Sequence, residues 1–384
     1  MKILWISEYE IPSGFARVSK ALIKQLQKRF DITVLDWYSE KESFVDGVKV
    51  LGKKSKEDKL GIEKMMNVYS GYDMIFILND VWNIAKYLKA LKSSKFFSVP
   101  KIAVYFPVDG THHNAEWYKD FDIVTQAVTY TNFAAGVIKE CTDALDSKLS
   151  IIPHGVDTDV FFKSQTDKAS IREHVYGTKG LNDAFIFMNA NRNQPRKKLD
   201  ITVRAFAEFL KISGAADAYL HLHCGLVDYG VNIVELIKRF GVDDRIIVST
   251  NESGMPNFSS EQLNLYYNAA DVGLNSSMAE GWGLTNVEHA MSGAPQIVPN
   301  HSACKELYDG NALLIDSPTE TVFYETITVG RIPDYRHMAK CMLAYYQNYE
   351  LRTSHGDGLK NKFSQPEYSW SKIANDFGDL FLKD

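Results

Sequence analysis

Short apolar runs, rich in β-branched residues, alternate along the chain with longer segments whose apolar positions recur every three to four residues. In the first half, the runs that this pattern predicts to be strands are Lys2–Ser7, Asp31–Leu35, Met74–Leu78, Lys101–Phe106 and Ile123–Ala127. In the second half they are Ala184–Asn189, Tyr219–His223, Ile246–Ser249, Val272–Asn275 and Gln296–Pro299. Strands separated by amphipathic helices are typical of parallel βαβ units. The sequence therefore predicts an α/β protein with two doubly wound sheets.

One polar, turn-rich segment, Phe162–Asn182, separates the two halves and contains no clear buried strand. A chain of 384 residues is long enough for two domains. We therefore expect one domain over residues 1–165 and a second over 166–364. Residues 365–384 form a third part, in which Ser369–Leu382 is predicted to be an amphipathic helix whose apolar side must pack on a neighbour.

Composition and charge are those of an ordinary globular protein, with 45% hydrophobic and 24% charged residues. The net charge of -5 gives no general attraction to nucleic acid or to an anionic membrane. We expect no nucleic-acid partner, and any phosphate group must be held by a local basic cluster.

The cysteines are scattered without the C-x-x-C spacing of a zinc site, at Cys141, Cys224, Cys304 and Cys341. They indicate reduced thiols rather than a disulfide framework. Only four apolar residues follow Lys2, too few for a signal peptide or a membrane span. These features favour a cytoplasmic protein without a transmembrane segment.

Two nucleotide-binding motifs are incomplete. Gly47–Lys54 nearly matches the phosphate loop GxxxxGK[ST], but Lys54 replaces the hydroxyl residue that would hold magnesium, and the valines favour a strand. The Rossmann pattern GxGxxG is absent after the first strand, where only Gly14 occurs. Neither a phosphate loop nor a nicotinamide enzyme is supported.

The segment Glu280–Glu288 runs from a strand end through a glycine turn into a helix. Exposed backbone N–H groups at a helix N-terminus form a cradle for phosphate. We expect a donor-binding turn made of Gly281, Trp282, Gly283, Leu284 and Thr285. Glu280 would then accept hydrogen bonds from sugar hydroxyls, and Glu288 from ribose hydroxyls. The alternative is ordinary helix capping with a solvated glutamate.

A basic loop, Asn191–Asp200, follows a predicted strand and precedes a helix. Arg192 offers a planar fork and Lys197 a mobile point charge, and together they can grip a diphosphate and stabilise it as a leaving group. The alternative is a solvated basic loop.

These segments resemble retaining glycosyltransferase family 4, whose members have the GT-B fold. Glu280 and Glu288 match its E-x7-E signature, and the basic loop resembles its G-R-x-x-P-x-K-G-x-D pattern. The resemblance implies two Rossmann-like domains facing across a cleft, with a last helix crossing back to the first domain. It assigns Glu280 to the donor sugar and Glu288 to the nucleotide ribose. Asn191 and Lys198 stand where the family has glycines, and His289 where it has a small residue.

Two weaker matches lie in the first half. Ile152–Phe161 resembles the family segment that closes the N-terminal domain, with His154 in place of Asn and in a structural role. Ile11–Val18 resembles the loop that approaches the donor phosphates. Ser13 and Gly14 are the donor-binding residues that this match implies.

A loop after the fourth predicted strand carries Asp109, His112 and His113. Family members often have a histidine there, near the reacting sugar, so we expect these residues on the acceptor side and Asp109 in the active site. His112, His113 and Glu116 could instead hold a metal ion, but no second ligand cluster accompanies them.

The resemblance implies a retaining hexosyltransferase that moves a sugar from GDP-mannose or a UDP-sugar to a glycan or another hydroxyl acceptor, without a metal or other cofactor. The chain loosely resembles soluble viral and bacterial members of the family. The catalytic set is Glu280, Arg192, Lys197 and Asp109, and Val248–Glu252 is expected to recognise the base. Alternatives are a phosphorylase, a sugar-nucleotide epimerase or a binding protein without catalysis. The sequence indicates no oligomeric state.

Overall fold

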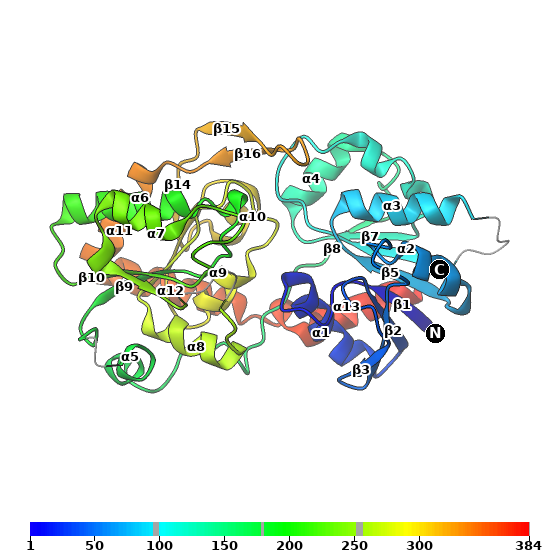
Figure 1. Ribbon diagram of the computed structural model, residues 1–384, viewed down its shortest axis with the longest axis horizontal. Helices are drawn as coiled ribbons and strands as arrows, with labels where there is room; N and C mark the ends of the chain where they lie inside the picture. Colours follow the sequence, from blue (N-terminus) through cyan, green and yellow to red (C-terminus); the bar gives the residue numbers. More distant parts are fainter. Residues whose placement is uncertain (95–99, 178–179, 251–255, 384) are drawn as a thin grey trace. The chain divides into compact units, whose positions relative to one another are not determined.

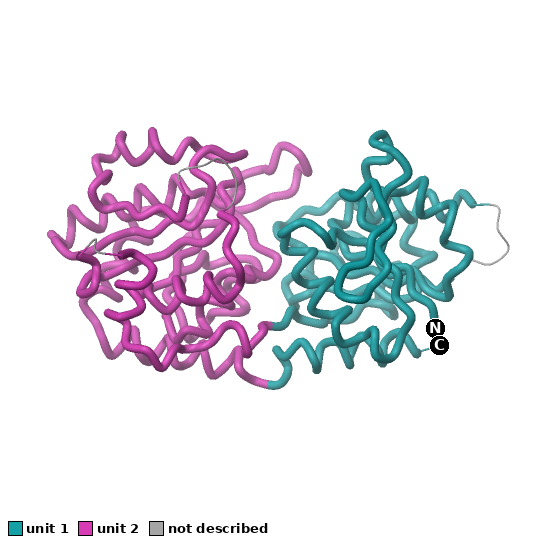
Figure 2. Tube along the Cα trace, turned by 60° about the horizontal axis from the view of Figure 1, so that its bottom comes forward, with its two compact units in different colours: residues 1–155, 366–384 teal, residues 156–365 magenta. Residues whose placement is uncertain are grey.

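The computed structural model describes residues 1–94, 100–177, 180–250 and 256–383, which form two compact units. Unit 1 comprises Met1–Gly155 and Pro366–Asp384, and unit 2 comprises Val156–Gln365 (Figure 2). The units divide at residues 155 and 156, ten residues before the division expected at 165 and 166. The intervening segment belongs to unit 2 because its backbone is bound there: the Phe162 and Ser164 N–H groups donate to the side chains of Asn264 and Asn268.

Unit 1 is built on an eight-stranded sheet with the order β3-β4-β2-β1-β5-β6-β7-β8. Its strands are β1 (Lys2–Ile6), β2 (Asp31–Asp36), β3 (Ser43–Val45), β4 (Val48–Gly52), β5 (Met74–Leu78), β6 (Lys101–Tyr105), β7 (Gln126–Thr129) and β8 (Leu149–Ile151). Its helices are α1 (Gly14–Leu26), α2 (Ile62–Val68), α3 (Val81–Lys92), α4 (Asn132–Cys141) and α13 (Trp370–Leu382) (Figure 1). All pairings are parallel except that of β3 with β4.

The closing helix α13 belongs to unit 1, where it packs against α1. Its buried Phe377 meets the rings of Phe76 and Tyr105 at centroid distances of 5.6 and 4.9 Å. Phe76 belongs to β5, which is buried along its whole length. A strand covered on both faces is apolar at every position rather than at alternate ones, which explains the continuous run Met74–Leu78.

Unit 2 is built on a six-stranded parallel sheet with the order β11-β10-β9-β12-β13-β14. These strands are β9 (Phe185–Asn189), β10 (Ala218–Leu222), β11 (Ile246–Val248), β12 (Val272–Leu274), β13 (Gln296–Pro299) and β14 (Leu313–Ile315). The helices are α5 (Lys168–Tyr176), α6 (Leu199–Ser213), α7 (Ile233–Phe240), α8 (Ser260–Ala269), α9 (Leu284–Ala290), α10 (Ser302–Tyr308), α11 (Tyr335–Gln347) and α12 (Tyr349–Phe363).

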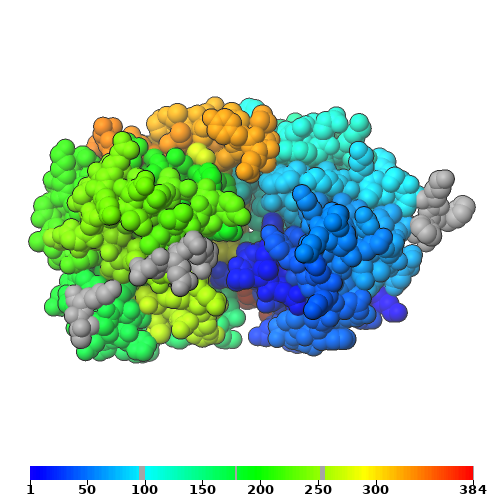
Figure 3. Space-filling view, viewed as in Figure 1, coloured from blue at the N-terminus to red at the C-terminus, as the bar shows by residue number. Residues whose placement is uncertain are grey.

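A separate antiparallel hairpin of β15 (Thr319–Val322) and β16 (Val329–Ile332) lies on the surface of unit 2 (orange in Figure 3). The Arg331 N–H donates to the Met278 carbonyl at 2.8 Å, so the hairpin holds the loop that follows β12. Among the described residues, no helix combines the length and the apolar character that crossing a bilayer requires.

The strand order of unit 2 reverses at β9, which has β10 on one side and β12 on the other. In a doubly wound sheet, the loops at the carboxyl ends of the strands diverge at such a point and leave room for a ligand. The basic loop Asn191–Asp200 follows β9, and the loop that contains Glu280 follows β12. The topology therefore brings the two most informative segments of the sequence to the same edge of the sheet.

Candidate functional site

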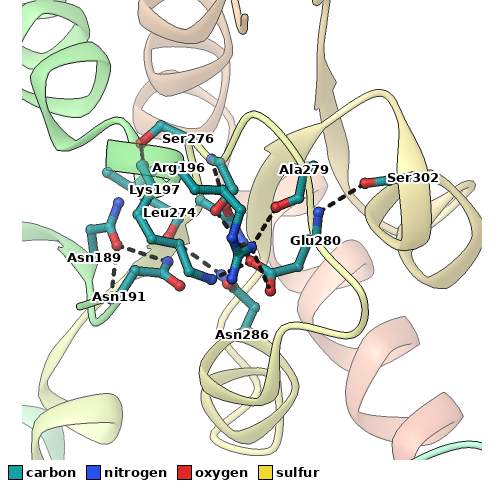
Figure 4. A network of polar contacts seen from close by, with 12 residues as sticks. Asn189, Asn191, Arg196, Lys197, Leu274, Ser276, Ala279, Glu280, Asn286 and Ser302 are labelled. Atoms are coloured by element: carbon teal, nitrogen blue, oxygen red, sulfur yellow. Dashed lines mark hydrogen bonds and ion pairs between the residues drawn. The ribbon is translucent and has the colours of Figure 1, made fainter. Parts of the chain in front are cut away.

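The loops after β9 and β12 are joined by a buried serine (Figure 4). The Ser276 hydroxyl lies 3.0 and 2.9 Å from the carbonyl oxygens of Lys197 and Lys198, and 2.7 Å from the Thr202 hydroxyl on α6. Ser276 is fully buried. These bonds fix the start of α6 against the end of β12 and set the position of Lys197.

Lys197 and Glu280 form an ion pair within the site. Both residues are buried, with exposed fractions of 8% and 6%. A second cation is close by, because Arg196 lies 3.5 Å from Glu280 Oε1 and donates to the Ala279 carbonyl at 2.6 Å. The Ser277 hydroxyl donates to Glu280 Oε2 at 3.1 Å. A buried carboxylate is thus surrounded by donors, which is how proteins keep such a group charged.

Glu280 remains ionised in this environment. Burial opposes the charge, but Lys197, Arg196 and the side-chain donors outweigh it and lower the pKa of Glu280 to about 2. The carboxylate is therefore an obligate hydrogen-bond acceptor at neutral pH.

Buried amides hold the Glu280 carboxylate from the side of the sheet. Asn275 Nδ2 lies 3.5 Å from Glu280 Oε2 and 3.0 Å from Asn286 Oδ1, and Asn286 Nδ2 donates to Gln296 Oε1 at 2.9 Å. Each of these side chains is at most 3% exposed. The chain of amides leaves the carboxylate little freedom to turn away from Lys197.

The glycine turn before α9 has the geometry that the sequence predicts. Gly283 adopts a φ of +86°, and an added Cβ would stand 3.3 Å from Glu280 Cγ, so a larger residue would meet both strain and crowding. Helix α9 begins at Leu284, and within the described part of the chain no side-chain hydrogen bond caps its first turn. Gly281, Trp282 and Gly283 are buried, while Leu284 and Thr285 are partly exposed. The N-terminus of α9 therefore lies next to Glu280, and its first two residues are partly exposed.

Glu288 lies on α9 and is 4% exposed. The Tyr267 hydroxyl is 3.5 Å from Glu288 Oε2, and the same tyrosine ring stacks on His289 at a centroid distance of 4.8 Å. Burial lowers the pKa of His289 to about 3, so its imidazole is neutral at neutral pH. Tyr267 thus explains how α9 accommodates a histidine where the resembling family has a small residue.

Arg192 is bound by the loop that follows β10. Its guanidinium binds Asp228 through two bonds, of 2.9 and 3.3 Å, and lies 5.2 Å from the centre of the Tyr229 ring. The bond from Arg192 lowers the pKa of Asp228. The binding of a diphosphate by Arg192 and Lys197 stays a prediction, and the arginine beside Glu280 is Arg196. The presence of four cations within seven residues was the available signal for Arg196.

Ser13, which was predicted to approach phosphate, makes hydrogen bonds within its own loop and to the first turn of α1. The Ser13 hydroxyl accepts a hydrogen bond from the Ala16 N–H at 3.1 Å and caps α1, while the Ser13 N–H donates to the Ile11 carbonyl at 2.9 Å. Gly14 is exposed and is the first residue of the helix. Both residues belong to unit 1.

The polar residues of the loop after β6 lie in different environments. His113 is buried, its Nδ1 lies 2.9 Å from the Tyr118 hydroxyl, and burial lowers its pKa to about 4, so it is part of the core. His112 is exposed. Burial raises the pKa of Tyr130 well above its usual range, and the charges of Tyr105, Asp80 and Asp109 raise it further. Sequence reasoning did not identify Asp80 or Tyr130.

His154 is buried where the chain leaves unit 1. Its Nδ1 lies 2.8 Å from the Tyr105 hydroxyl, and burial lowers its pKa to about 3. Its neighbour Gly155 lies against α13, because an added Cβ would be 2.7 Å from Trp370 Cδ2. These contacts give the segment the structural role that the sequence suggested.

The segment Val248–Glu252, expected to recognise the base, is described only in part. Strand β11 ends at Val248, while Asn251 and Glu252 lie outside the described residues. Over residues 1–94, 100–177, 180–250 and 256–383, no three His, Cys, Asp or Glu side chains gather as they would to hold a metal ion.

Comparison with known proteins gives similarities of two kinds. The chain is 29% identical to the alpha-monoglucosyldiacylglycerol synthase of Acholeplasma laidlawii over 157 residues, and 28% identical to the D-inositol 3-phosphate glycosyltransferase of Nocardiopsis dassonvillei over 174 residues. These matches cover 40% and 44% of this chain. The chain spans 36% and 38% of the length of these curated relatives. No protein-family model matches the sequence.

Among solved structures, the fold is similar to that of Anabaena HepE in complex with UDP and glucose, with a TM-score of 0.73 and 16% identity. The similarity covers 99% of this chain and 98% of that one. Together with the two mainly parallel sheets, it shows that the fold is the GT-B fold of glycosyltransferases, an α/β architecture of two Rossmann-like units.

Proposed function

We propose that the protein is a glycosyltransferase whose unit 2 binds a nucleotide-sugar donor at the Lys197–Glu280 pair. The observation that carries the proposal is this buried, charged pair at the carboxyl ends of β9 and β12, beside the N-terminus of α9. Cations and a helix N-terminus suit a diphosphate, whereas a carboxylate suits sugar hydroxyls. The two chemistries occur together in a nucleotide-sugar.

Donor binding would rearrange the charges of the free site. The diphosphate competes with Glu280 for Lys197 and Arg196, and with Asp228 for Arg192. Each cation therefore exchanges a carboxylate partner for a phosphate. Glu280 is then left to accept hydrogen bonds from the sugar, while Glu288 serves the ribose. Tyr267 supports this assignment of Glu288, because it orients the carboxylate from within the core.

We further propose that transfer occurs with retention and on one face of the sugar. The acceptor oxygen forms its bond to the anomeric carbon as the bond to the phosphate oxygen breaks, and the acceptor proton passes to the departing diphosphate. A double displacement would need a carboxylate nucleophile at the anomeric carbon, whereas this proposal assigns Glu280 to the sugar hydroxyls and Glu288 to the ribose. Lys197, Arg196 and the α9 N-terminus would stabilise the leaving charge without a metal ion.

The donor is proposed to be a UDP-sugar or GDP-mannose, and the acceptor a glycan or another hydroxyl compound. The structural neighbour HepE was solved with UDP and glucose, which makes UDP-glucose the first donor to test. Asp109 of unit 1, with Tyr130 and Asp80 near it, is proposed to serve the acceptor side.

The test is an assay of sugar transfer. The protein is incubated with UDP-glucose or GDP-mannose and a panel of mono-, oligo- and lipid-linked saccharides, and products are detected by mass spectrometry. Proton NMR of the product then gives its anomeric configuration. The proposal expects a product that depends on the donor and has the anomeric configuration of the donor sugar.

The same assay separates the alternatives. A phosphorylase would release sugar phosphate when inorganic phosphate is added, and an epimerase would convert the donor without any acceptor. Tight donor binding without transfer to any member of the panel would favour a binding protein and contradict the proposed activity.

A further inference from the structure

Ser302 combines two unusual features beside Glu280. Its φ is +50°, in the left-handed region that residues other than glycine, asparagine and aspartate rarely adopt. Its hydroxyl oxygen accepts a hydrogen bond from the Glu280 N–H at 3.1 Å (Figure 4). Both residues are buried, with exposed fractions of 8% and 6%. A strained backbone that makes a buried bond to a site residue calls for a functional explanation.

The segment around Ser302 holds Glu280 on both sides of its Cα. Ser302 accepts from the N–H, and the Ala303 N–H donates to the Glu280 carbonyl at 3.2 Å. Ser302 and Ala303 begin α10, which follows β13, whereas Glu280 follows β12. The backbone of Glu280 is thus fixed by the loop of the neighbouring strand.

Glu280 depends on such an anchor because it lies in an irregular loop. Residues 275–283 belong to no helix or strand, so no ladder of backbone bonds sets their course. The loop is fixed at Met278, whose N–H donates to the Arg196 carbonyl and whose carbonyl accepts from Arg331. The bonds to Ser302 and Ala303 form a second fixed point, at the residue whose carboxylate must meet the ligand.

We propose that Ser302 is a positioning residue for Glu280, and that its left-handed backbone is retained because it places the hydroxyl oxygen at the Glu280 N–H. This inference rests on the proposed function, in which Glu280 binds the donor sugar. Ser302 then governs the contribution of the sugar to donor affinity, and has little effect on the contribution of the nucleotide diphosphate.

The test compares Ser302→Ala with Ser302→Gly by isothermal titration with UDP-glucose, GDP-mannose, UDP and GDP. Both variants remove the hydroxyl and leave the buried Glu280 N–H without its acceptor. Of UDP-glucose and GDP-mannose, we expect the one that the wild type binds more tightly to bind about tenfold more weakly to both variants. The affinity for the diphosphate of the same nucleoside should change by less than about twofold. Only glycine relieves the strain, so Ser302→Gly should melt at a higher temperature than Ser302→Ala.

Two controls separate this role from a merely structural one. Asp46→Gly relieves another left-handed residue, with a φ of +53°, in the turn between β3 and β4 of unit 1, and should leave donor affinity unchanged. In a Glu280→Gln background, adding Ser302→Gly should weaken nucleotide-sugar binding less than it does in the wild type, because the carboxylate that Ser302 positions is gone.

If Ser302→Gly bound the nucleotide-sugar as the wild type does while Glu280→Gln bound it more weakly, the positioning role would be wrong. If Glu280→Gln left nucleotide-sugar binding unchanged, or if the wild type bound none of the four compounds, the proposed function would fail first and the inference with it.

Discussion

Glu280 illustrates how one residue links stability to the site. Its pKa in the folded chain is lowered from 4.5 to about 2, so the stabilisation it provides is fully present above about pH 4.5 and is lost as the pH falls toward 2. Replacing it with glutamine leaves Lys197 buried without an anionic partner, which should destabilise unit 2 by about 3 kcal/mol at pH 7.

The pH dependence of that difference can be measured by urea unfolding. We expect the gap in unfolding free energy between the wild type and Glu280→Gln to be constant from pH 7 to about 5 and to shrink from about 4.5 downward. A gap that stayed the same down to pH 3 would show that folding does not lower the pKa of Glu280.

Lys198 shows what a family pattern reveals and what it leaves out. The resembling family has glycine at this position, and Lys198 adopts a φ of +48°, so the local backbone is one that glycine would favour. The left-handed conformation costs a lysine about 1 kcal/mol or more. Its ion pair with Asp200, at 3.2 Å, is partly exposed and contributes less than that.

Lys198→Gly is therefore expected to raise the free energy of unfolding by about 1 kcal/mol, as measured by urea titration. Lys340→Gly makes the same chemical change at an exposed position inside α11 and should lower it by about 1 kcal/mol. Equal effects at the two positions would contradict the strained conformation of Lys198.

Other residue contacts could not be predicted. Arg192 and Asp228 lie 36 residues apart in loops that follow different strands, and nothing in their spacing indicates that they meet. The direct pairing of Lys197 with Glu280, 83 residues apart, was not predicted either, although both belong to motifs assigned to one site. Periodicity locates helices and strands, whereas contacts between loops depend on tertiary geometry.

At the scale of elements, the alternating pattern located the buried strands well. Met74–Leu78 and Gln296–Pro299 are strands within the bounds expected from the sequence. The strands that the pattern did not single out, β3, β8, β14 and the hairpin β15–β16, are short and partly exposed. A strand with an open face or edge needs fewer apolar residues, so its signal is weak.

The packing of α13 gives a direct test at this scale. Phe377→Ala would leave a cavity beside Phe76 and Tyr105 and should lower the unfolding free energy of unit 1 by about 3–5 kcal/mol. Leu382→Ala changes a residue of the same helix that is 58% exposed and should have an effect below about 0.5 kcal/mol. Similar results for the two variants, by chemical unfolding, would contradict the packing of α13 on unit 1.

At the scale of the whole molecule, the fold class was predictable and the division of the chain was less so. The alternation of strands and helices predicts two doubly wound sheets, whichever residue divides the two units. The residue at which unit 2 begins depends on which side chains accept hydrogen bonds from the backbone of residues 156–165. Those side chains are Asn264 and Asn268, about a hundred residues away. Polar linker composition alone could not place it.

The central claim is that unit 2 divides donor recognition between Lys197, which binds the diphosphate, and Glu280, which binds the sugar. Isothermal titration of the wild type, Lys197→Met and Glu280→Gln with UDP-glucose, GDP-mannose, UDP and GDP tests it, with circular dichroism to confirm that each variant is folded. We predict that Lys197→Met binds nucleotide-sugar and diphosphate alike about 30-fold more weakly, because it loses a buried charged contact. Glu280→Gln should lose affinity for the nucleotide-sugar but none for the diphosphate, which no longer competes with a Glu280 carboxylate for Lys197. Folded variants that bound all four compounds as the wild type does would contradict the claim.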